Sequence, residues 1–405
     1  TMDRLWLLLA VFITRLPAPL IGAGPKEYDS AARSRMPEDR FLRMLAAAGA
    51  QQRIRVVVVD ADYGAVQDGT IRGFRRLHGR WVPCSCPLPD VVYDRSFAKS
   101  AEARTRIRQS LQALMNAGAK PLSSELPDKL LVQDVLLRHP ELAKLVPPTW
   151  LYQGSRQLRR LLKLSPEGLF LKPAAGTQGR GALRIRQYGE EAVLDGRTRA
   201  NQTFSFRYAS LQEASERVDR FVGASRFLIQ PLLPLLDTEH RPHDVRLLMQ
   251  KDNNGRWVST CTVSRVGQNG SVTSNLHGGG TAESAKERLS RLYGSDKAVI
   301  LLHKIVSAGQ QAAPWIEQHY GRFAEFGFDF GLSQGGKLWL LEANSKPGRQ
   351  SLKLTGDTQA ERLSVRRLLS YARKIADGKP LHSRASSGHN QYVGFPSDYV
   401  QEVHP

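Results

Sequence analysis

The sequence has few cysteines and no hydrophobic run long enough to span a bilayer. Cys84, Cys86 and Cys261 are its only cysteines, too few for a disulfide framework, and "CSC" alone is too sparse for a structural zinc site. We therefore expect free thiols and a cytoplasmic, reducing setting. The one long apolar run near the start, residues 5–13 (LWLLLAVFI), is too short for a membrane span. Asp3 before it, and no clean small-residue cleavage site after it, favour a buried first strand over a secretory signal.

Acidic residues are scarce beside basic ones. The chain has 58 Lys and Arg against 38 Asp and Glu, a formal charge of +20, which favours polyanionic partners. However, no RNA-recognition signature, zinc finger or basic zipper accompanies the charge. Much of it lies on amphipathic helical patterns at 155–164 and 362–379, where solvated faces explain it. Nucleic-acid binding is therefore disfavoured.

A chain of 405 residues is too long for one small core and predicts two or three packed units. Up to about residue 120, strand-like and helix-like stretches alternate, which predicts a parallel α/β domain. The expected strands are 5–13, 53–63 and 89–95, and the expected helices are 39–50 and 101–118.

The rest of the chain has short strands and two helical regions. The patterns predict strands within 168–187, 226–278 and 323–344, and helices within 281–320 and 358–376. Residues 377–405 have the polar, glycine- and proline-bearing composition of a loose tail.

A glycine-rich stretch, GLFLKPAAGTQGRGALRIRQ (168–187), carries Gly176, Gly179 and Gly181. It is not a P-loop, and no helix follows it as in a dinucleotide-binding turn. A strand enters and an alternating strand leaves, so we expect a hairpin flap whose backbone amides could cover phosphates, with Lys172 at its base. On this stretch alone, an ordinary flexible hairpin with an exposed lysine remains an equal alternative.

Two oxygen donors end the strand in WLLEANSKPG (339–348). Glu342 and Asn344 are two residues apart, so they share one face of the strand. Asp329 in FGFDFG would lie on a neighbouring strand if SQGG (333–336) forms the turn. Two adjacent carboxylates repel without a cation, and carboxylates plus an amide are ligands suited to magnesium. The pattern therefore predicts Mg2+ on a nucleotide rather than a polar cap of the sheet.

The order of these features resembles that of the ATP-grasp superfamily: a lysine, a glycine-rich flap, a hinge, and then Asp…Glu-x-Asn. Within it, the chain resembles the YheC/YheD group of endospore coat-associated proteins in residues 87–95, 241–257, 264–280 and LLEANSKPG. The resemblance covers about 87 to 376. It implies an α/β (α+β ATP-grasp) fold: an N-terminal parallel α/β domain (1–120), then a two-lobed ATP-grasp domain (121–376) with antiparallel sheets. Its small lobe would span about 145–232 and its large lobe about 233–376.

The resemblance also implies nucleotide-binding residues. Lys129 matches the first nucleotide lysine and Lys172 the second, while the flap glycines would cover the phosphates. The Pro231 carbonyl and the Leu233 amide would face adenine, and Asp237 would bind the ribose. Gln230 stands where many relatives have glutamate, a mild departure that bears on adenine preference.

For the chemistry, the resemblance implies Asp329, Glu342 and Asn344 as magnesium ligands. Arg246, Arg265 and Asn275 would hold the transferred phosphoryl group and the acyl phosphate. Residues 278–280 could form an anion nest. His277 is as well explained by a structural role as by a base.

The activity implied is that of an ATP-dependent carboxylate–amine ligase that forms an amide or peptide bond through an acyl phosphate, with ATP and Mg2+ as cofactors. Its partners would be ATP, a carboxylate substrate and an amine substrate, with spore-coat association implied by the group. A non-catalytic nucleotide-binding coat scaffold is the first alternative, and a polyanion or nucleic-acid binder is the weaker one. The residues name neither substrate and leave the oligomeric state open, because acceptor pockets are built from variable loops.

Overall fold

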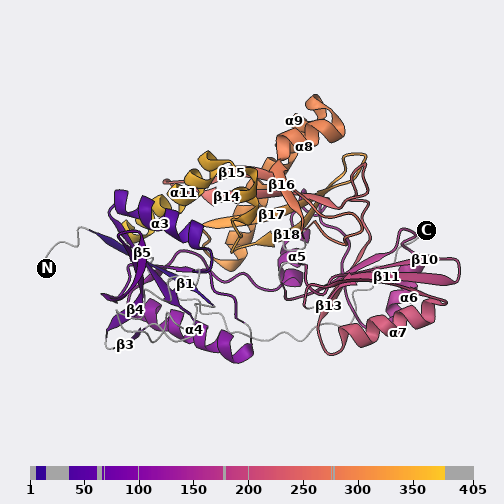
Figure 1. Cartoon of the computed structure of the whole chain (residues 1–405), viewed down its shortest axis with the longest axis horizontal. Coiled ribbons are helices and arrows are strands. Elements are labelled where there is room, and N and C mark those ends of the chain that lie inside the picture. Colours follow the sequence, from indigo (N-terminus) through magenta and orange to yellow (C-terminus); the bar gives the residue numbers. More distant parts are fainter. Residues whose placement is uncertain are drawn as a thin grey trace.

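The protein contains three β-sheets and their covering helices. Figure 1 shows the first and second sheets at opposite ends of the molecule and the third sheet between them. The computed structural model describes residues 6–14, 36–61, 66–67, 69–98, 100–176, 179–198, 200–274, 276 and 279–378. Within these ranges, no helix is both long and apolar enough to cross a membrane.

The first sheet is mixed, with strand order β3-β4-β2-β1-β6-β7 and β5 paired to β4. Its centre is parallel, as predicted, and every residue of β1 is buried, which confirms a first core strand. The antiparallel hairpin of β4 and β5 was not predicted, because its strands carry four arginines and lack a long apolar run. The elements are β1 (Leu7–Ile13), α3 (Asp39–Gln51), β2 (Ile54–Asp60), β3 (Val66–Gln67), β4 (Thr70–Leu77), β5 (Arg80–Pro87), β6 (Val91–Asp94), α4 (Ala101–Asn116) and β7 (Lys120–Pro121).

The second sheet is antiparallel, in the order β12-β11-β10-β9-β13-β8. Two amphipathic helices, α6 and α7, pack their apolar sides into its core, and Leu158, Leu161 and Leu162 are buried there as predicted. Strands β11 and β12 were not predicted; β12 is mostly exposed, and β11 includes Glu191, Asp195 and Arg197. The elements are α5 (Lys129–Leu137), β8 (Trp150–Leu151), α6 (Ser155–Lys163), β9 (Leu169–Pro173), β10 (Leu183–Tyr188), β11 (Glu191–Arg197), β12 (Thr203–Tyr208), α7 (Leu211–Val222) and β13 (Phe227–Pro231).

The third sheet is also antiparallel, in the order β16-β15-β14-β17-β18. The long helix α9 packs on it, and the alternate phenylalanines of β17 fill the shared core. The elements are β14 (His243–Lys251), β15 (Trp257–Val266), β16 (Thr281–Ser284), α8 (Ala285–Tyr293), α9 (Ser295–Tyr320), β17 (Glu325–Leu332), β18 (Leu338–Asn344), α10 (Gln350–Thr355) and α11 (Thr358–Asp377).

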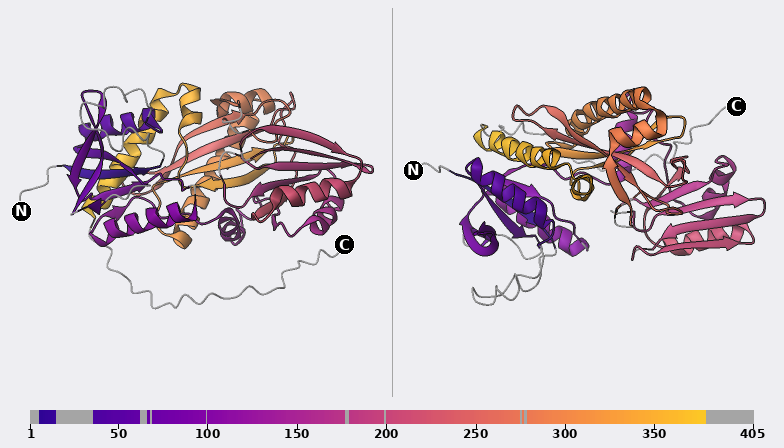
Figure 2. Two further views of the ribbon diagram at one scale, coloured as in Figure 1. Left: turned by 60° about the horizontal axis from the view of Figure 1, so that its bottom comes forward. Right: turned by 45° about the horizontal axis from the view of Figure 1, so that its top comes forward.

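The last described helix, α11, packs against the N-terminal unit. Its apolar face enters the core of the first sheet, against β1, β2 and α3, while the helix also contacts β14 of the third sheet. Both views in Figure 2 show α11 beside α3. The N-terminal unit is therefore held against the third sheet by a helix that follows that sheet in sequence. The expected loose tail lies, from residue 379 on, outside the described residues.

Candidate functional site

A cavity of about 1260 Å³ is lined by residues of all three sheets. Its lining includes the flap, the segment after β13, the ends of β17 and β18, and part of the N-terminal unit. Most of the predicted site residues meet in this cavity: Lys129, Lys172, Gly176, Gly179, Gln230, Pro231, Leu233, Arg246, Arg265, Asp329, Glu342 and Asn344.

The acidic end of the cavity is built by the β17–β18 hairpin. Its turn has the predicted place, with the Gly336 amide donating to the Ser333 carbonyl at 2.7 Å. In the register, Asp329 lies opposite Glu342, and Asn344 follows two residues further along β18. Opposite residues in an antiparallel pair point to the same side, so the three side chains share one face. A bulge next to Asp329 supplies the one-residue shift that this pairing needs.

Two arginines neutralise Asp329. Arg246 lies opposite it on β14 and donates from Nε and Nη2 to its two carboxylate oxygens, each at 2.7 Å. Arg265, buried on β15, adds an ion pair of 2.9 Å and binds Asp244 through two further hydrogen bonds of 2.7 and 2.6 Å. Burial by itself would raise the pKa of Asp329, but Arg246 and Arg265 outweigh it and lower the pKa to about 2. The aspartate is therefore ionised.

Two lysines face this acidic end. Lys129 is the first residue of α5, where the side chain of Asp128 caps the helix, and its Nζ lies 3.4 Å from Oε1 of Glu342. Lys172, at the end of β9, donates to the Leu341 carbonyl at 3.4 Å. Burial and then the charge of Lys129 lower the pKa of Lys172 to about 8, although Glu342 and Asp329 act in the opposite direction. Two close ammonium groups are suited to bind the negative oxygens of phosphates.

The flap has the predicted hairpin form, since β9 and β10 are antiparallel neighbours. Gly179 and Gly181 have φ of 67° and 75°, a backbone region that favours glycine, and a Cβ at Gly181 would come within 3.1 Å of Pro173. Gly176 and Gly179 line the cavity, whereas Gly181 does not.

Gln230 has a fixed orientation beside the cavity. Its Nε2 donates to the Thr149 hydroxyl at 2.8 Å, and that hydroxyl donates in turn to the Pro147 carbonyl at 2.9 Å. Because the hydroxyl has only one proton, it accepts from Gln230, so the Gln230 oxygen points elsewhere as an acceptor. The glutamine thus offers the same acceptor that a glutamate would.

Some sequence predictions lie elsewhere. Asp237 is only 2% exposed and does not line the cavity: it pairs with Arg241 at 3.0 Å and with Arg288, and it accepts the amides of Glu239 and Arg241. The carboxylate is thus engaged by Arg241, by Arg288 of α8 and by two backbone amides, and the ribose role of Asp237 stays a prediction. Asn275, His277 and Gly278 lie outside the described residues.

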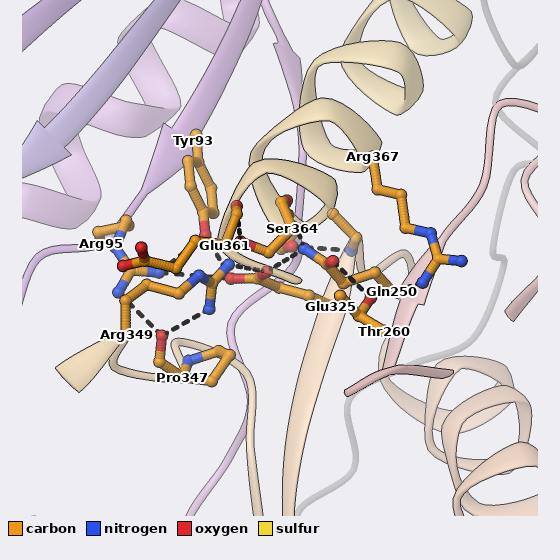
Figure 3. A network of polar contacts seen from close by, with 12 residues as sticks. Tyr93, Arg95, Gln250, Thr260, Glu325, Pro347, Arg349, Glu361, Ser364 and Arg367 are labelled. Carbon is orange, nitrogen blue, oxygen red and sulfur yellow. Dashed lines mark hydrogen bonds and ion pairs between the residues drawn. The ribbon is translucent and has the colours of Figure 1, made fainter. Parts of the chain in front are cut away.

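Sequence reasoning missed the residues at the boundary with the N-terminal unit. Lys346, Pro347 and Arg349 closely follow β18, and Arg95 directly follows β6; all four line the cavity. Figure 3 shows Arg95 and Arg349 gathered with Tyr93 around Glu325. The only signal was that PLPDVVYDR, which contains Arg95, and LLEANSKPG, which ends one residue before Arg349, carry the family resemblance.

The donor set fits a magnesium ion. Among the described residues, no three His, Cys, Asp or Glu side chains form a metal-binding group, so the amide of Asn344 is needed beside Asp329 and Glu342. Glu342 has a single ion pair of 3.4 Å, and Asn344 donates its amide nitrogen to the Gly327 carbonyl at 3.5 Å, which leaves its oxygen as an acceptor. Hard oxygen ligands on neighbouring strands are the chemistry that Mg2+ prefers.

Comparison with known proteins gives the family. The model of the YheC/D-like ATP-grasp family matches residues 118–375. The chain belongs to this family. It is 26% identical to the endospore coat-associated protein YheD of Bacillus subtilis (strain 168) over 314 residues, which is 77% of this chain and 68% of YheD. It is 28% identical to the endospore coat-associated protein YheC of the same organism over 291 residues, covering 70% of this chain and 77% of YheC.

The fold is the predicted ATP-grasp fold. The chain superposes on D-alanyl-alanine synthetase A of Vibrio cholerae O1 biovar eltor with a TM-score of 0.51 and 13% identity, covering 92% of this chain and 99% of the synthetase. The similarity confirms two antiparallel lobes after an N-terminal sheet with helices. The strand pairing adds that this first sheet is mixed, with the predicted parallel centre and an antiparallel edge.

Proposed function

We propose that this ATP-grasp protein is an ATP-dependent carboxylate–amine ligase. The observation that supports it most is the gathering, in one cavity, of two lysines, the Asp329–Glu342–Asn344 face and two arginines. A site that binds a nucleotide alone needs the lysines. The arginines beside the acidic face add positive charge where a transferring phosphoryl group would develop negative charge.

The nucleotide would lie between the flap sheet and the third sheet. Lys129 and Lys172 would bind its phosphates, the segment from Gln230 to Leu233 would face the base, and Asp329, Glu342 and Asn344 would hold Mg2+. Bound there, the ion would neutralise phosphate charge.

The reaction has two displacements. An oxygen of the substrate carboxylate attacks the γ-phosphorus and the bond to ADP breaks, which gives an acyl phosphate. The amine nitrogen then attacks the carbonyl carbon, loses a proton and expels phosphate. Arg246 lines the cavity and is less buried than Arg265, so it is the arginine placed to bind the transferred group. Arg265 would hold Asp244 and Asp329 in place.

The test is a screen of ADP release against carboxylates and amines, followed by hydroxylamine trapping of the acyl phosphate. We expect trapped hydroxamate with the wild type and a loss of orders of magnitude with Arg246→Ala, while nucleotide affinity changes little. Arg256→Ala is the matched control, since Arg256 is an exposed arginine outside the cavity. Equal trapping by wild type and Arg246→Ala would remove Arg246 from the mechanism.

A second candidate is a nucleotide-binding scaffold of the spore coat. The similarity to two endospore coat-associated relatives favours it. It predicts ATP binding without ADP release for every carboxylate and amine in the screen, and no trapped hydroxamate.

A further inference from the structure

The cavity continues from the metal-site strand to the N-terminal unit, because the chain after Asn344 crosses to it. Lys346 donates to the Asp94 carboxylate at 2.6 Å and to the Ser96 carbonyl at 2.8 Å. Pro347, the next residue, lies near Arg246, because both approach Gly327 from the same side. A Cβ added to Gly327 would be 2.8 Å from the Cβ of Pro347 and 3.6 Å from the Nε of Arg246. The boundary is therefore adjacent to the arginine proposed to act on the phosphoryl group.

Two buried arginines from distant parts of the chain meet here. Arg95 is 2% exposed and Arg349 is 9% exposed, and both line the cavity. Each donates to the Pro347 carbonyl at 3.0 Å, and each guanidinium lies over the Phe41 ring, 5.1 and 4.9 Å from its centre. The Nε of Arg349 is buried, and no described residue accepts a hydrogen bond from it. A buried donor without a partner is costly, and a ligand acceptor would relieve it.

Two glutamates, Glu325 and Glu38, bind this arginine pair, and only Glu325 is fully buried. Glu325, at the centre of Figure 3, is fully buried and binds Arg349, Arg95 at 3.3 Å and the Tyr93 hydroxyl. The other carboxylate belongs to Glu38, whose side chain is 29% exposed and borders the cavity. It accepts from Nε and Nη2 of Arg95 at 2.6 and 2.7 Å, the paired geometry in which arginine also binds a substrate carboxylate.

Glu38 is an unusual residue for its place. It is the N-cap of α3, where Ser, Thr, Asp or Asn in extended backbone would normally cap the helix. Its φ is 52°, in the left-handed region, and its side chain makes no capping hydrogen bond. A non-glycine residue held in this region stores strain, which is common at functional sites. The chain thus gives up a helix cap and places a carboxylate on Arg95.

We infer that the Arg95–Arg349 pair binds a carboxylate of the substrate other than the group that reacts, and that Glu38 occupies this position until the substrate displaces it. The inference rests on the proposed ligase function and names its substrate class: a small acid or acidic peptide with a carboxylate besides its reacting group. Release of Glu38 also frees its backbone from the left-handed region, which offsets part of the cost of displacement.

Calorimetry without nucleotide tests the subsite apart from catalysis. The probe is glutarate, and its diamide glutaramide, of nearly equal size but without a carboxylate, is the uncharged control. We expect Glu38→Gln to bind glutarate at least about tenfold more tightly than wild type, because the competing carboxylate is gone. The diamide, which has no carboxylate to bind the arginines, should gain little.

Asp39→Asn is the matched control. Asp39 is the next residue and also lines the cavity, but it pairs with Arg43 and Trp81 rather than with the arginine pair. It removes the same charge, so glutarate affinity should stay within about twofold of wild type. An equal gain in both variants, or no gain in Glu38→Gln, overturns the subsite.

Arg349→Gln in the Glu38→Gln background should lose the gain, with thermal unfolding used to confirm the fold. A triglutamate peptide run beside glutarate separates the two sources: tighter binding of the peptide identifies an acidic peptide. Absence of ADP release in every ligase screen, together with the Glu38→Gln gain, would reject the ligase and keep the subsite. ADP release in the ligase screen without a gain in glutarate affinity in Glu38→Gln would keep the ligase and reject the subsite.

Discussion

Arg246 and Asp329 lie opposite each other on β14 and β17 and share two hydrogen bonds of 2.7 Å each. Arg265 reaches the same carboxylate at 2.9 Å, so Asp329, a proposed magnesium ligand, binds two guanidinium groups. Its charge therefore serves the fold as well as the proposed metal. Glu342, across the hairpin, has one ion pair of 3.4 Å. The two acids of one site should respond differently to neutralisation.

Asp329→Asn should destabilise the protein. It leaves Arg246 and Arg265 without a shared counter-charge in a buried place, a change that costs about 3–5 kcal/mol for buried pairs. Urea unfolding followed by circular dichroism measures the free energy of unfolding. A loss below about 1 kcal/mol would mean that other groups neutralise the arginines.

Glu342→Gln should leave stability within about 1 kcal/mol of wild type, because its side chain is 25% exposed and its ion pair is long. It should nevertheless abolish ADP formation, since it removes one ligand charge from the proposed magnesium site. Undiminished ADP formation by a folded Glu342→Gln protein contradicts the metal assignment.

Lys172→Met should weaken ATP binding. The substitution keeps the length of the side chain but removes a charge-assisted hydrogen bond worth roughly 1.5–3 kcal/mol, or roughly 10- to 150-fold in affinity. Calorimetric titration checks this, with Lys163→Met on the exposed side of α6 as the control. Equal affinity of Lys172→Met and wild type would place the phosphates elsewhere.

ATP affinity should fall as the pH rises through about 8. The pKa of Lys172 is lowered to about 8 by burial and by Lys129, so below this pH its ammonium is already charged and affinity is flat. Bound phosphates would raise the pKa of Lys172. Above about pH 8, Lys172 must therefore take up a proton when ATP binds, and the affinity falls by at most about tenfold per pH unit. Lys172→Arg, which stays charged, should show a flat profile. If the ATP affinity of Lys172→Arg fell with pH as steeply as that of wild type, Lys172 would be excluded as the source of the pH dependence.

Thr149→Val should lower the preference for ATP over GTP. In the wild type, the hydrogen bond to Thr149 would turn the Gln230 oxygen toward the base, where it would repel the carbonyl oxygen of guanine. Without the hydroxyl, the Gln230 amide can turn its nitrogen toward the base and donate to that carbonyl. Loss of one orienting hydrogen bond should reduce the affinity ratio by roughly fivefold to tenfold. Competition of the two nucleotides for one labelled analogue measures this ratio, and an unchanged ratio would mean that Gln230 does not face the base.

Local patterns were enough to predict the flap, the SQGG turn and the common face of Glu342 and Asn344. Each depends on residues close in sequence: turn glycines, strand alternation and helical spacing act within one element. The run at 5–13 was likewise identified as a core strand by its own apolar residues.

The tertiary structure decided what depends on register and on distant segments. Strand pairing placed Arg246 against Asp329, and ion pairs with Arg241 and Arg288 hold Asp237 outside the cavity lining. Packing of α11 on the first sheet brought the two halves of the chain together. At their boundary Arg95 binds Glu38 and shares the Pro347 carbonyl with Arg349, and no local pattern marks these residues. Sequence alone specified the chemistry of each strand end because that chemistry is local. Which charges face each other was set by long-range pairing, whose register no single segment encodes.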